Sequence, residues 1–217
     1  RAELAGVSRP LAQARGLPNR HYACAETFRA EAARLLRGGW ACVAAGAEVP
    51  NPGDAAPIDF LGAPLLLVRD HQGALRLYQN VCRHRGMILV AEKRNFGGVI
   101  RCPYHSWCYS LDGALRATPH AGGPGINMAE SIDRDATGLI PVRMGVFLDA
   151  VFADLSGAAG PFEDFIAPLA ARWADFADRP LHHGGASSRF TLDLRCNWKL
   201  AVENYCESYH LPWVHPG

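Results

Sequence analysis

The chain has 217 residues, 49% of them hydrophobic and 20% charged, which is typical of a folded protein with a sizeable core. Its 22 Lys and Arg against 21 Asp and Glu give a formal net charge of +1, so no whole-chain field attracts nucleic acid or an anionic membrane. The apolar run at residues 144–155 contains two aspartates and is too short to span a bilayer. We therefore expect neither nucleic acid nor a membrane as a partner.

The first residues of the chain and its cysteines indicate in which cellular compartment the protein is expected. The first residues lack a basic start followed by an apolar stretch, so they do not predict a secretory signal. A chain that opens on arginine is also expected to continue upstream. The seven cysteines are an odd number spread over a long chain, which favours metal chemistry in a reducing compartment over disulfides. We expect a cytoplasmic protein.

The N-terminal part of the chain predicts a helical segment, residues 1–38. Residues 20–37 carry apolar side chains at helical spacing, among them Phe28, Leu35 and Leu36. A Gly-Gly pair then stops the pattern, as glycines do at the end of a helix.

The residue pattern of the sequence changes at Trp40, where short apolar runs separated by Pro, Gly and Asp begin. Two sites within this region carry turn residues between such runs, at residues 70–73 and at Asp112-Gly113. Both patterns predict β-hairpins. We expect a small all-β domain over residues 39–156.

The region after this β domain has a different pattern. SGAAGP at residues 156–161 predicts a linker, and apolar residues at helical spacing follow it. Residues 188–196 alternate between apolar and polar side chains, which predicts a half-buried strand. Asn197 can then cap a helix that begins at Trp198 and that Pro212 should end. These elements begin a second domain.

Two segments of the β domain each offer one cysteine and one histidine. The first reads Cys82-Arg-His84, and after 17 intervening residues the second reads Cys102-Pro-Tyr-His105. A structural zinc site usually pairs Cys with Cys and His with His. In a Rieske [2Fe–2S] centre, two thiolates hold one iron and two imidazoles hold the other, so the mixed pairing predicts such a cluster. A zinc site, or cysteines that are simply buried, are the alternatives.

The segments CRHRG and CPYHSWCYSLDG resemble the Rieske signature of the ring-hydroxylating oxygenase alpha subunits. Ser106 stands where those proteins often have Gly, and it is not among the ligand positions. The other cysteines have no partner spacing and are expected to lie in the core. They are Cys24, Cys42, Cys108, Cys196 and Cys206.

A second group of candidate ligands lies near the end of the chain, in NWKLAVENYCESYHLPWVHPG. His210 and, past a proline, His215 can converge on one cation, and two His with one carboxylate are the usual frame for non-haem Fe(II). An isolated pair of histidines is as often ordinary polar packing. Downstream of a Rieske signature, however, this segment resembles the mononuclear-iron motif of the same family, with Asn204, an acid at Glu207 and the two histidines in matching order.

The resemblance also assigns roles around this second site. It implies that the third iron ligand is an Asp far beyond Gly217, so the 217 residues are expected to be part of a longer protein. Glu207, three residues before His210, could accept the free N–H of a metal-bound imidazole. In the family an acid here, usually Asp, bridges a cluster histidine of one subunit to an iron histidine of its neighbour. We therefore predict catalytic roles for Glu207 and Asn204.

The fold class that the resemblance implies is α+β. An all-β Rieske domain is followed by the beginning, residues 157–217, of an α+β catalytic domain of the helix-grip type that is incomplete at its C-terminus. The longer acid at Glu207 and the short N-terminal extension look more like the members that oxidise quaternary ammonium or N-methyl compounds, such as carnitine and glycine betaine, than the naphthalene-type dioxygenases.

The function that follows is that of a terminal oxygenase. It passes electrons from a Rieske cluster to a mononuclear Fe(II) and activates O2 to hydroxylate or demethylate a small organic substrate. Because the chain has no Gly-rich dinucleotide fingerprint, a separate reductase or ferredoxin is expected to donate electrons. The family's electron route crosses between subunits and implies a homotrimer. The alternatives are a Rieske ferredoxin-like electron carrier, whose later histidines bind nothing, and a zinc-stabilised binding module.

Overall fold

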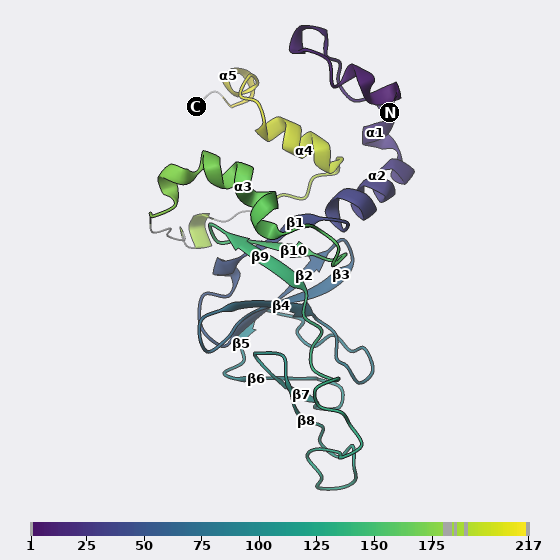
Figure 1. Ribbon diagram of the computed structural model, residues 1–217, viewed down its shortest axis with the longest axis vertical. Coiled ribbons are helices and arrows are strands. Elements are labelled where there is room, and N and C mark those ends of the chain that lie inside the picture. Colours follow the sequence, from purple (N-terminus) through teal and green to yellow (C-terminus); the bar gives the residue numbers. More distant parts are fainter. Residues whose placement is uncertain (1, 180–183, 185, 189–190, 216–217) are drawn as a thin grey trace. The chain divides into compact units, whose positions relative to one another are not determined.

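The computed structural model describes residues 2–179, 184, 186–188 and 191–215. The chain divides into two compact units. One consists of residues 34–183 and is called the β unit here. The other joins residues 1–33 to residues 184–217 and is called the terminal unit. The elements of each unit are labelled in Figure 1 and are described unit by unit.

The described part of the β unit contains three antiparallel sheets, with the strand orders β1-β10-β9, β4-β3-β2-β5 and β6-β7-β8. The strands are β1 (Trp40–Ala45), β2 (Asp54–Phe60), β3 (Ala63–Arg69), β4 (Leu75–Gln79), β5 (Arg94–Asn95), β6 (Val99–Arg101), β7 (Cys108–Ser110), β8 (Leu115–Ala117), β9 (Arg143–Phe147) and β10 (Ala150–Asp154). Short 3-10 turns lie at Gly46–Glu48 and Ala174–Phe176, and one helix, α3 (Phe162–Arg172), follows the last strand.

The central sheet separates two hydrophobic cores, and β3 supplies side chains to both. Because successive side chains of a strand point to opposite faces, Leu66 and Val68 enter one core while Leu65 and Leu67 enter the other. The strand therefore reads as a continuous apolar run and not as an alternating one. The first core also contains Cys82 and Cys102, so the predicted cluster ligands lie at the end of a packed interior.

Both predicted hairpins are confirmed. Strands β3 and β4 pair on either side of the turn at residues 70–73, where Gly73 has a φ of +82°. The carboxylate of Asp70 stabilises this turn by accepting hydrogen bonds from the backbone N–H groups of Gln72 and Ala74. Strands β7 and β8 pair around Asp112-Gly113 in the same way.

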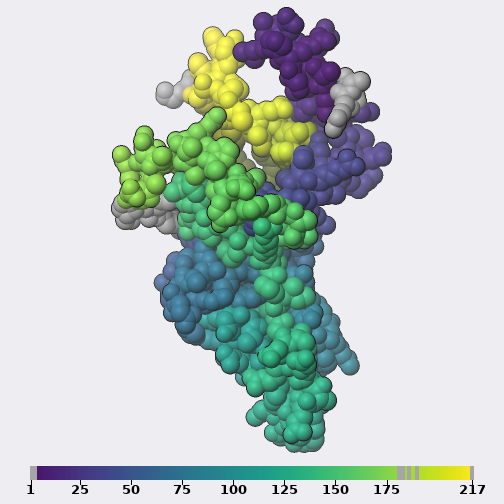
Figure 2. All heavy atoms as spheres, viewed as in Figure 1, coloured from purple at the N-terminus to yellow at the C-terminus, as the bar shows by residue number. Residues whose placement is uncertain are grey.

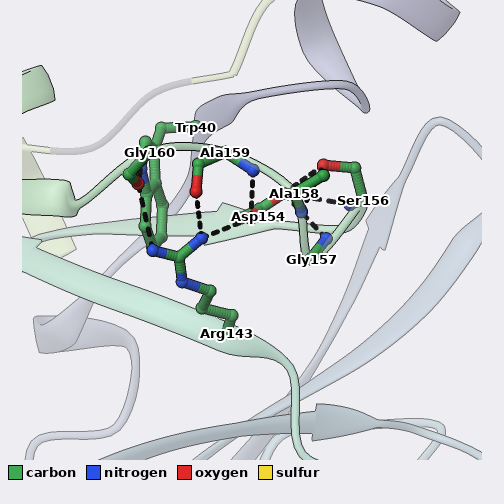
Figure 3. A network of polar contacts seen from close by, with 8 residues as sticks. All are labelled: Trp40, Arg143, Asp154, Ser156, Gly157, Ala158, Ala159 and Gly160. Atoms are coloured by element: carbon green, nitrogen blue, oxygen red, sulfur yellow. Dashed lines mark hydrogen bonds and ion pairs between the residues drawn. The ribbon is translucent and has the colours of Figure 1, made fainter.

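The predicted linker at residues 156–161 is held against the first sheet. Trp40, Asp154 and Arg143 are register neighbours on β1, β10 and β9, so they form a row across this sheet. The buried carboxylate of Asp154 accepts hydrogen bonds from the guanidinium of Arg143 at 2.9 Å and from the backbone N–H groups of Ser156, Gly157 and Ala159, each at 3.0 Å (Figure 3). The segment therefore follows a fixed path.

Helix α3 begins where this path ends. The carbonyl of Gly160 accepts hydrogen bonds from the indole of Trp40 and from Arg143, each at 3.0 Å (Figure 3). Phe162, the first residue of α3, packs edge-on against Trp40 with ring centroids 5.0 Å apart. A Cβ at Gly145 would lie 2.3 Å from the ring of Phe162, so only glycine fits at this point of β9.

The terminal unit brings together segments from both ends of the sequence. Its helices are α1 (Arg20–Ala23), α2 (Ala25–Glu31), α4 (Trp198–Tyr205) and α5 (Leu211–Val214), with short turns at Ala2–Gly6, Leu11–Gln13 and Ala186–Ser188. Hydrogen bonds join α1 and α2 to α4 although more than 160 residues separate them. The purple and yellow atoms of the two ends of the chain accordingly lie next to one another in Figure 2.

The predicted N-terminal helix over residues 20–37 is present but divided. Cys24 has an extended conformation, with φ −90° and ψ 119°, and therefore ends α1 and begins α2. The last five helical residues, Ala32–Leu36, form a wider π-type turn. Among the described residues, none of the helices is both long and apolar enough to cross a membrane.

Two sequence predictions near the C-terminus were wrong. No strand forms at residues 191–196; Phe190 lies outside the described residues. Leu192 and Leu194 are 66% and 61% exposed, because no neighbouring strand among the described residues pairs with this segment. The helix from Trp198, capped by Asn197 as predicted, ends at Tyr205 and does not continue to His210. Pro212 does not end it, but lies in the first turn of α5, where proline is tolerated.

Candidate metal centres

Two loops of the β unit share one backbone pattern and carry the predicted cluster ligands. In the first, the N–H of Cys82 donates to the carbonyl of Met87 and the N–H of Gly86 donates to the carbonyl of Cys82. In the second, Cys102 and Trp107 make the first of these bonds, and Ser106 and Cys102 make the second. Each loop is therefore closed by the same two hydrogen bonds and presents its cysteine and histidine from one tight turn.

The two loops place like side chains together. Cys82 and Cys102 are 3% and 2% exposed and belong to the same core. Burial, together with the adjacent Cys82 thiol, raises the pKa of Cys102. The rings of His84 and His105 lie edge to face with centroids 4.7 Å apart, and His84 is exposed at the surface. The two thiols are thus buried, while His105 is partly buried and His84 is exposed, an order that suits a Rieske cluster with two thiolates on one iron and two imidazoles on the other.

The imidazoles of His84 and His105 have nitrogen atoms that are available to bind a metal. The Nδ1 atom of His105 is buried and has no hydrogen-bond partner among the described residues, which suits a nitrogen that binds a metal. Desolvation, followed by the neighbouring charge of His105, lowers the pKa of His84, which favours the neutral ring that metal binding requires. Aromatic rings contact both histidines: Trp107 stacks on His84 with ring centroids 4.9 Å apart, and the ring of Tyr104 lies tilted against that of His105 at 3.8 Å.

Tyr109 contacts the thiol side of this site and was not among the residues singled out from the sequence. Its hydroxyl lies 3.4 Å from the Sγ atom of Cys82 and accepts a hydrogen bond from the N–H of Arg83 at 3.0 Å. Burial raises the pKa of this hydroxyl well above its ordinary value, so it keeps its proton. An aromatic residue four positions after His105 was the available sequence signal.

The backbone at Ser106 explains why the family often has Gly at this position. It has a φ of +59°, in the left-handed region that glycine adopts without strain. The equivalent position of the first loop is Gly86, with a φ of +70°. Both turns thus require the same backbone conformation, and Ser106 adopts it at a steric cost.

The expectation that the remaining cysteines lie in the core was largely wrong. Cys108 is buried, but Cys24 is only partly buried and the other three are exposed. Cys42 lies on β1, while Cys196 and Cys206 lie on either side of α4. The exposed cysteines are Cys42, Cys196 and Cys206.

The second group of candidate ligands lies on a turn between α4 and α5. The carboxylate of Glu207 accepts hydrogen bonds from the backbone N–H groups of Tyr209 and His210. These bonds replace those that a continuing helix would make, which is why α4 ends at Tyr205. His210 caps the start of α5 and His215 lies at its end, so one short helix separates the two imidazoles.

This turn brings the candidate iron ligands together. The rings of His210 and His215 have centroids 5.7 Å apart, and both residues line a cavity of about 640 Å³ with Asn204 and Glu207. Nδ1 of His210 contacts a carboxylate oxygen of Glu207, and this hydrogen bond lowers the pKa of Glu207. The contact leaves Nε2 of His210 for a metal, the arrangement in which a carboxylate orients a ligating imidazole.

The residue types at both sites therefore suit the metal groups that they would hold, but the two sites differ in the number of protein ligands present. Within the part of the chain that the structure describes, no three His, Cys, Asp or Glu side chains are placed to hold one ion. A Rieske cluster needs only two protein ligands on each iron, whereas the mononuclear site needs a carboxylate besides His210 and His215.

Comparison with sequence families gives two matches. Residues 39–131 match the family described as the Rieske [2Fe-2S] domain, and residues 181–217 match the catalytic domain of the ring hydroxylating alpha subunit. The second match argues against a Rieske ferredoxin that lacks an oxygenase site. The first favours a [2Fe–2S] cluster over zinc.

Similar proteins agree with these matches. The carnitine monooxygenase oxygenase subunit of Escherichia coli K12 is 33% identical over 201 residues, which are 93% of this chain and 52% of that protein. The glycine betaine monooxygenase oxygenase subunit of Chromohalobacter salexigens is 30% identical over 200 residues, 92% of this chain and 43% of that protein. A solved quaternary ammonium Rieske monooxygenase, described in terms of carnitine oxidation and inter-subunit electron transfer, superposes with a TM-score of 0.74 at 30% identity, covering 92% of this chain and 53% of that one.

The comparisons also show how much of its relatives this chain spans, and they agree with the predicted fold class. The chain spans about half the length of the curated relatives it matches. The predicted α+β class is confirmed: sheets of the Rieske type occupy the β unit, and the chain ends within a partial catalytic domain.

Proposed function

Because this chain belongs to the alpha subunits of the Rieske-type ring-hydroxylating oxygenases, we propose that the whole protein is a terminal oxygenase component. Its cofactors, a Rieske [2Fe–2S] cluster and a mononuclear iron, supply electron storage and O2 activation for hydroxylation or demethylation of a small substrate. Within this proposal residues 1–38 are an N-terminal helical segment, residues 39–156 are the Rieske domain and residues 157–217 begin the catalytic domain.

One observation carries the proposal. The rings of two imidazoles, those of His84 and His105, have centroids 4.7 Å apart, and two thiols, those of Cys82 and Cys102, are buried in one core. Each pair comes from two loops with the same backbone bonds, an arrangement that suits two irons with different ligands. We assign the cluster to these four residues.

The mononuclear iron is assigned to His210 and His215. Glu207 holds His210 through Nδ1, so the side chain of His210 is oriented before metal binds. Asn204 lines the same cavity, which supports a role for it in contacting the substrate. The third ligand is expected from a part of the whole protein that lies beyond Gly217.

The substrate class proposed is quaternary ammonium compounds. Relatives named for carnitine and for glycine betaine support it, as does the glutamate at position 207. Aromatic compounds are the second class, since residues 181–217 match the catalytic domain of the ring hydroxylating alpha subunit.

The partners follow from the same assignment. A reductase, alone or with a ferredoxin, would donate electrons, and O2 and the organic compound would be the substrates. We propose a cytoplasmic homotrimer in which Glu207 links His210 to His84 or His105 of the neighbouring subunit. The description of a similar monooxygenase in terms of inter-subunit electron transfer supports this route.

The test is oxygen incorporation by the whole protein. Purified protein, a family reductase and a panel of carnitine, glycine betaine and naphthalene would be supplied with ¹⁸O2, and products would be analysed by mass spectrometry. We expect substrate-dependent O2 uptake and ¹⁸O in the product of a quaternary ammonium compound. Electron uptake without oxygen incorporation, for every compound, would indicate an electron carrier instead.

Spectroscopy tests the metal assignment separately. Reduced protein should give an electron paramagnetic resonance signal of a mixed Cys and His cluster, and an all-cysteine signal would reject the four ligands. Iron should exceed the cluster iron by one per chain in the whole protein, and this excess should be lost when His215 is replaced by Ala. Excess iron that survives this substitution would show that other residues hold it.

A further inference from the structure

Helix α4 is held by polar side chains on one face. Lys199 and Glu203 are four residues apart and therefore lie on the same side of the helix, one turn apart. Lys199 is the buried residue of this helix, whereas the apolar Leu200 and Val202 are 45% and 50% exposed. Among the described residues, Lys199 and Glu203 therefore make the side-chain contacts that attach this face of α4 to the N-terminal helices.

The first of these contacts joins α4 to the end of α2. Nζ of Lys199 lies 2.5 Å from a carboxylate oxygen of Glu31, and the side chains are only 11% and 15% exposed. The indole N–H of Trp198 donates to the same oxygen at 3.3 Å. Only two of the 22 Lys and Arg residues of the chain are lysines, and Lys199 is one of them. This site therefore has an ammonium group, whereas most basic positions of the chain have a guanidinium group. The compact ammonium suits a narrow, partly buried contact with a single carboxylate oxygen.

The second contact joins α4 to α1. The hydroxyl of Tyr22 donates to a carboxylate oxygen of Glu203 at 2.7 Å. The side-chain amide of Asn197 donates to the carbonyl of Tyr22 at 3.1 Å, while its oxygen caps α4 by accepting from the N–H of Lys199. The first and the last turn of α4 are thus both attached to the N-terminal helices.

The attached helix leads directly into the iron site. Asn204, next to Glu203, lines the cavity with Glu207, His210 and His215. Only the turn organised by Glu207 separates the end of α4 from His210. A shift of α4 would therefore move Asn204, which is part of the helix, and the turn that follows it directly in the chain.

We propose that α1 and α2 position the mononuclear iron site, with Glu31 and Tyr22 as positioning residues that act through Lys199 and Glu203. The inference rests on the proposed function, since it concerns the iron ligands assigned there. It adds that the N-terminal segment, remote in sequence from His210, determines how well the site binds iron.

The experiment is a charge-exchange cycle in the whole protein. Glu31→Lys, Lys199→Glu and the double variant would be compared with Glu26→Lys, a control on the exposed side of the same helix. Mononuclear iron affinity would be measured by titration with Fe(II). Electron paramagnetic resonance of the ferrous site exposed to nitric oxide would report its symmetry. The cluster spectrum of each variant, which arises from the β unit, would show that the rest of the protein has folded.

We expect each single variant to lose about tenfold or more in iron affinity and to show an altered nitric oxide spectrum, as removal of an orienting partner does at metal sites. The double variant, which restores an opposite-charge pair, should recover much of the affinity, and Glu26→Lys should match the wild type. Tyr22→Phe, a milder change, should alter the nitric oxide spectrum and lower iron affinity with the fold retained.

The proposal is overturned if the single variants bind iron as the control does, or if the double variant recovers nothing while Tyr22→Phe leaves the spectrum unchanged. These measurements need no substrate. A wild-type protein that binds the extra iron but oxidises none of the compounds would contradict the proposed function and leave the positioning result standing.

Discussion

The hydroxyl of Tyr109 lies 3.4 Å from the Sγ atom of Cys82, and the N–H of Arg83 donates to the same hydroxyl oxygen. A cysteine that binds iron does so as a thiolate and has no proton to give. With the cluster bound, the hydroxyl is therefore the donor and Cys82 the acceptor. This hydrogen bond places partial positive charge beside the sulfur, and it is one of the means by which a protein raises a cluster potential.

Tyr109→Phe should therefore lower the reduction potential of the cluster, on the order of tens of mV, while the cluster spectrum is retained. Tyr78→Phe is the matched control, because Tyr78 is buried in the same core but donates to the carbonyl of Leu111. Redox titration followed by circular dichroism measures both variants. Equal potentials in the wild type and in Tyr109→Phe would show that the contact with Cys82 does not influence the cluster.

Ser106 and Gly86 allow an opposite pair of stability predictions. Ser106→Gly removes a side chain from a left-handed position and should stabilise the cluster loop by about 0.5–1 kcal/mol, after the entropy of an extra glycine in the unfolded chain is subtracted. Gly86→Ala should destabilise it by about 1 kcal/mol. No atom lies within 4 Å of a Cβ built at Gly86, so backbone strain alone is tested.

The measurement is the urea concentration at which each protein loses its cluster absorbance. Ser106→Gly should shift this midpoint upward and Gly86→Ala downward. Gly73→Ala, at a left-handed position in a hairpin remote from the ligands, controls for the general effect of such a substitution. If the urea midpoints of both loop variants shifted in the same direction, the idea that both positions require a left-handed backbone would be contradicted.

Asp154 should make the β unit sensitive to acid. Burial by itself would raise the pKa of its carboxyl, but hydrogen bonds from Ser156, Ala159 and Arg143 outweigh burial and lower the pKa. A lowered folded-state pKa means that the carboxylate stabilises the fold above the unfolded pKa of about 3.9, and that this contribution is lost as pH falls through the folded value. Asp154→Asn should cost about 2–3 kcal/mol at neutral pH.

Urea unfolding of the wild type and Asp154→Asn between pH 7 and pH 3 checks this dependence. The difference in free energy of unfolding should be constant near neutral pH and should shrink below about pH 4, as the wild-type carboxyl takes up its proton. Asp178→Asn, an exposed position, should show little difference at any pH. A difference that is equal at pH 7 and pH 3 would mean that the charge of Asp154 is not what stabilises the segment.

Glu207→Gln tests the proposed bridge between subunits. The amide keeps the shape of the side chain and an acceptor oxygen that still orients Nδ1 of His210, but it loses the charge. We expect an intact, reducible cluster and near-normal mononuclear iron, with electron transfer between the centres slowed by roughly 10- to 100-fold. Single-turnover oxidation of the pre-reduced cluster, with substrate and O2 present, measures this step. Reoxidation at the wild-type rate would show that Glu207 only shapes its turn.

Sequence patterns predicted those features that depend on neighbouring residues. The hairpin at residues 70–73 and the cap at Asn197 are local, and both were confirmed. The spacing of Cys82, His84, Cys102 and His105 indicated a shared site, and the structure brings the loops together, although the assignment of the ligands stays a prediction.

The features that were missed depend on remote or competing contacts. A strand at residues 191–196 needs a partner that periodicity cannot supply. The helix from Trp198 ends early because the Glu207 carboxylate takes backbone N–H groups that the helix would use. The pairing of Lys199 with Glu31 spans 168 residues, and no pattern within either segment indicates it.

The Asp154 network also determines which positions of residues 155–160 can vary. Asp154 binds this segment mostly through backbone N–H groups, which every residue except proline provides. The identity of the side chains at Ala158 and Ala159 therefore matters little to the path of the chain, and a mutational library should accept many residues there. Gly157, with a φ of +67°, and Asp154 itself should be the intolerant positions. Apart from these positions, the fold constrains the length of the segment more than its composition.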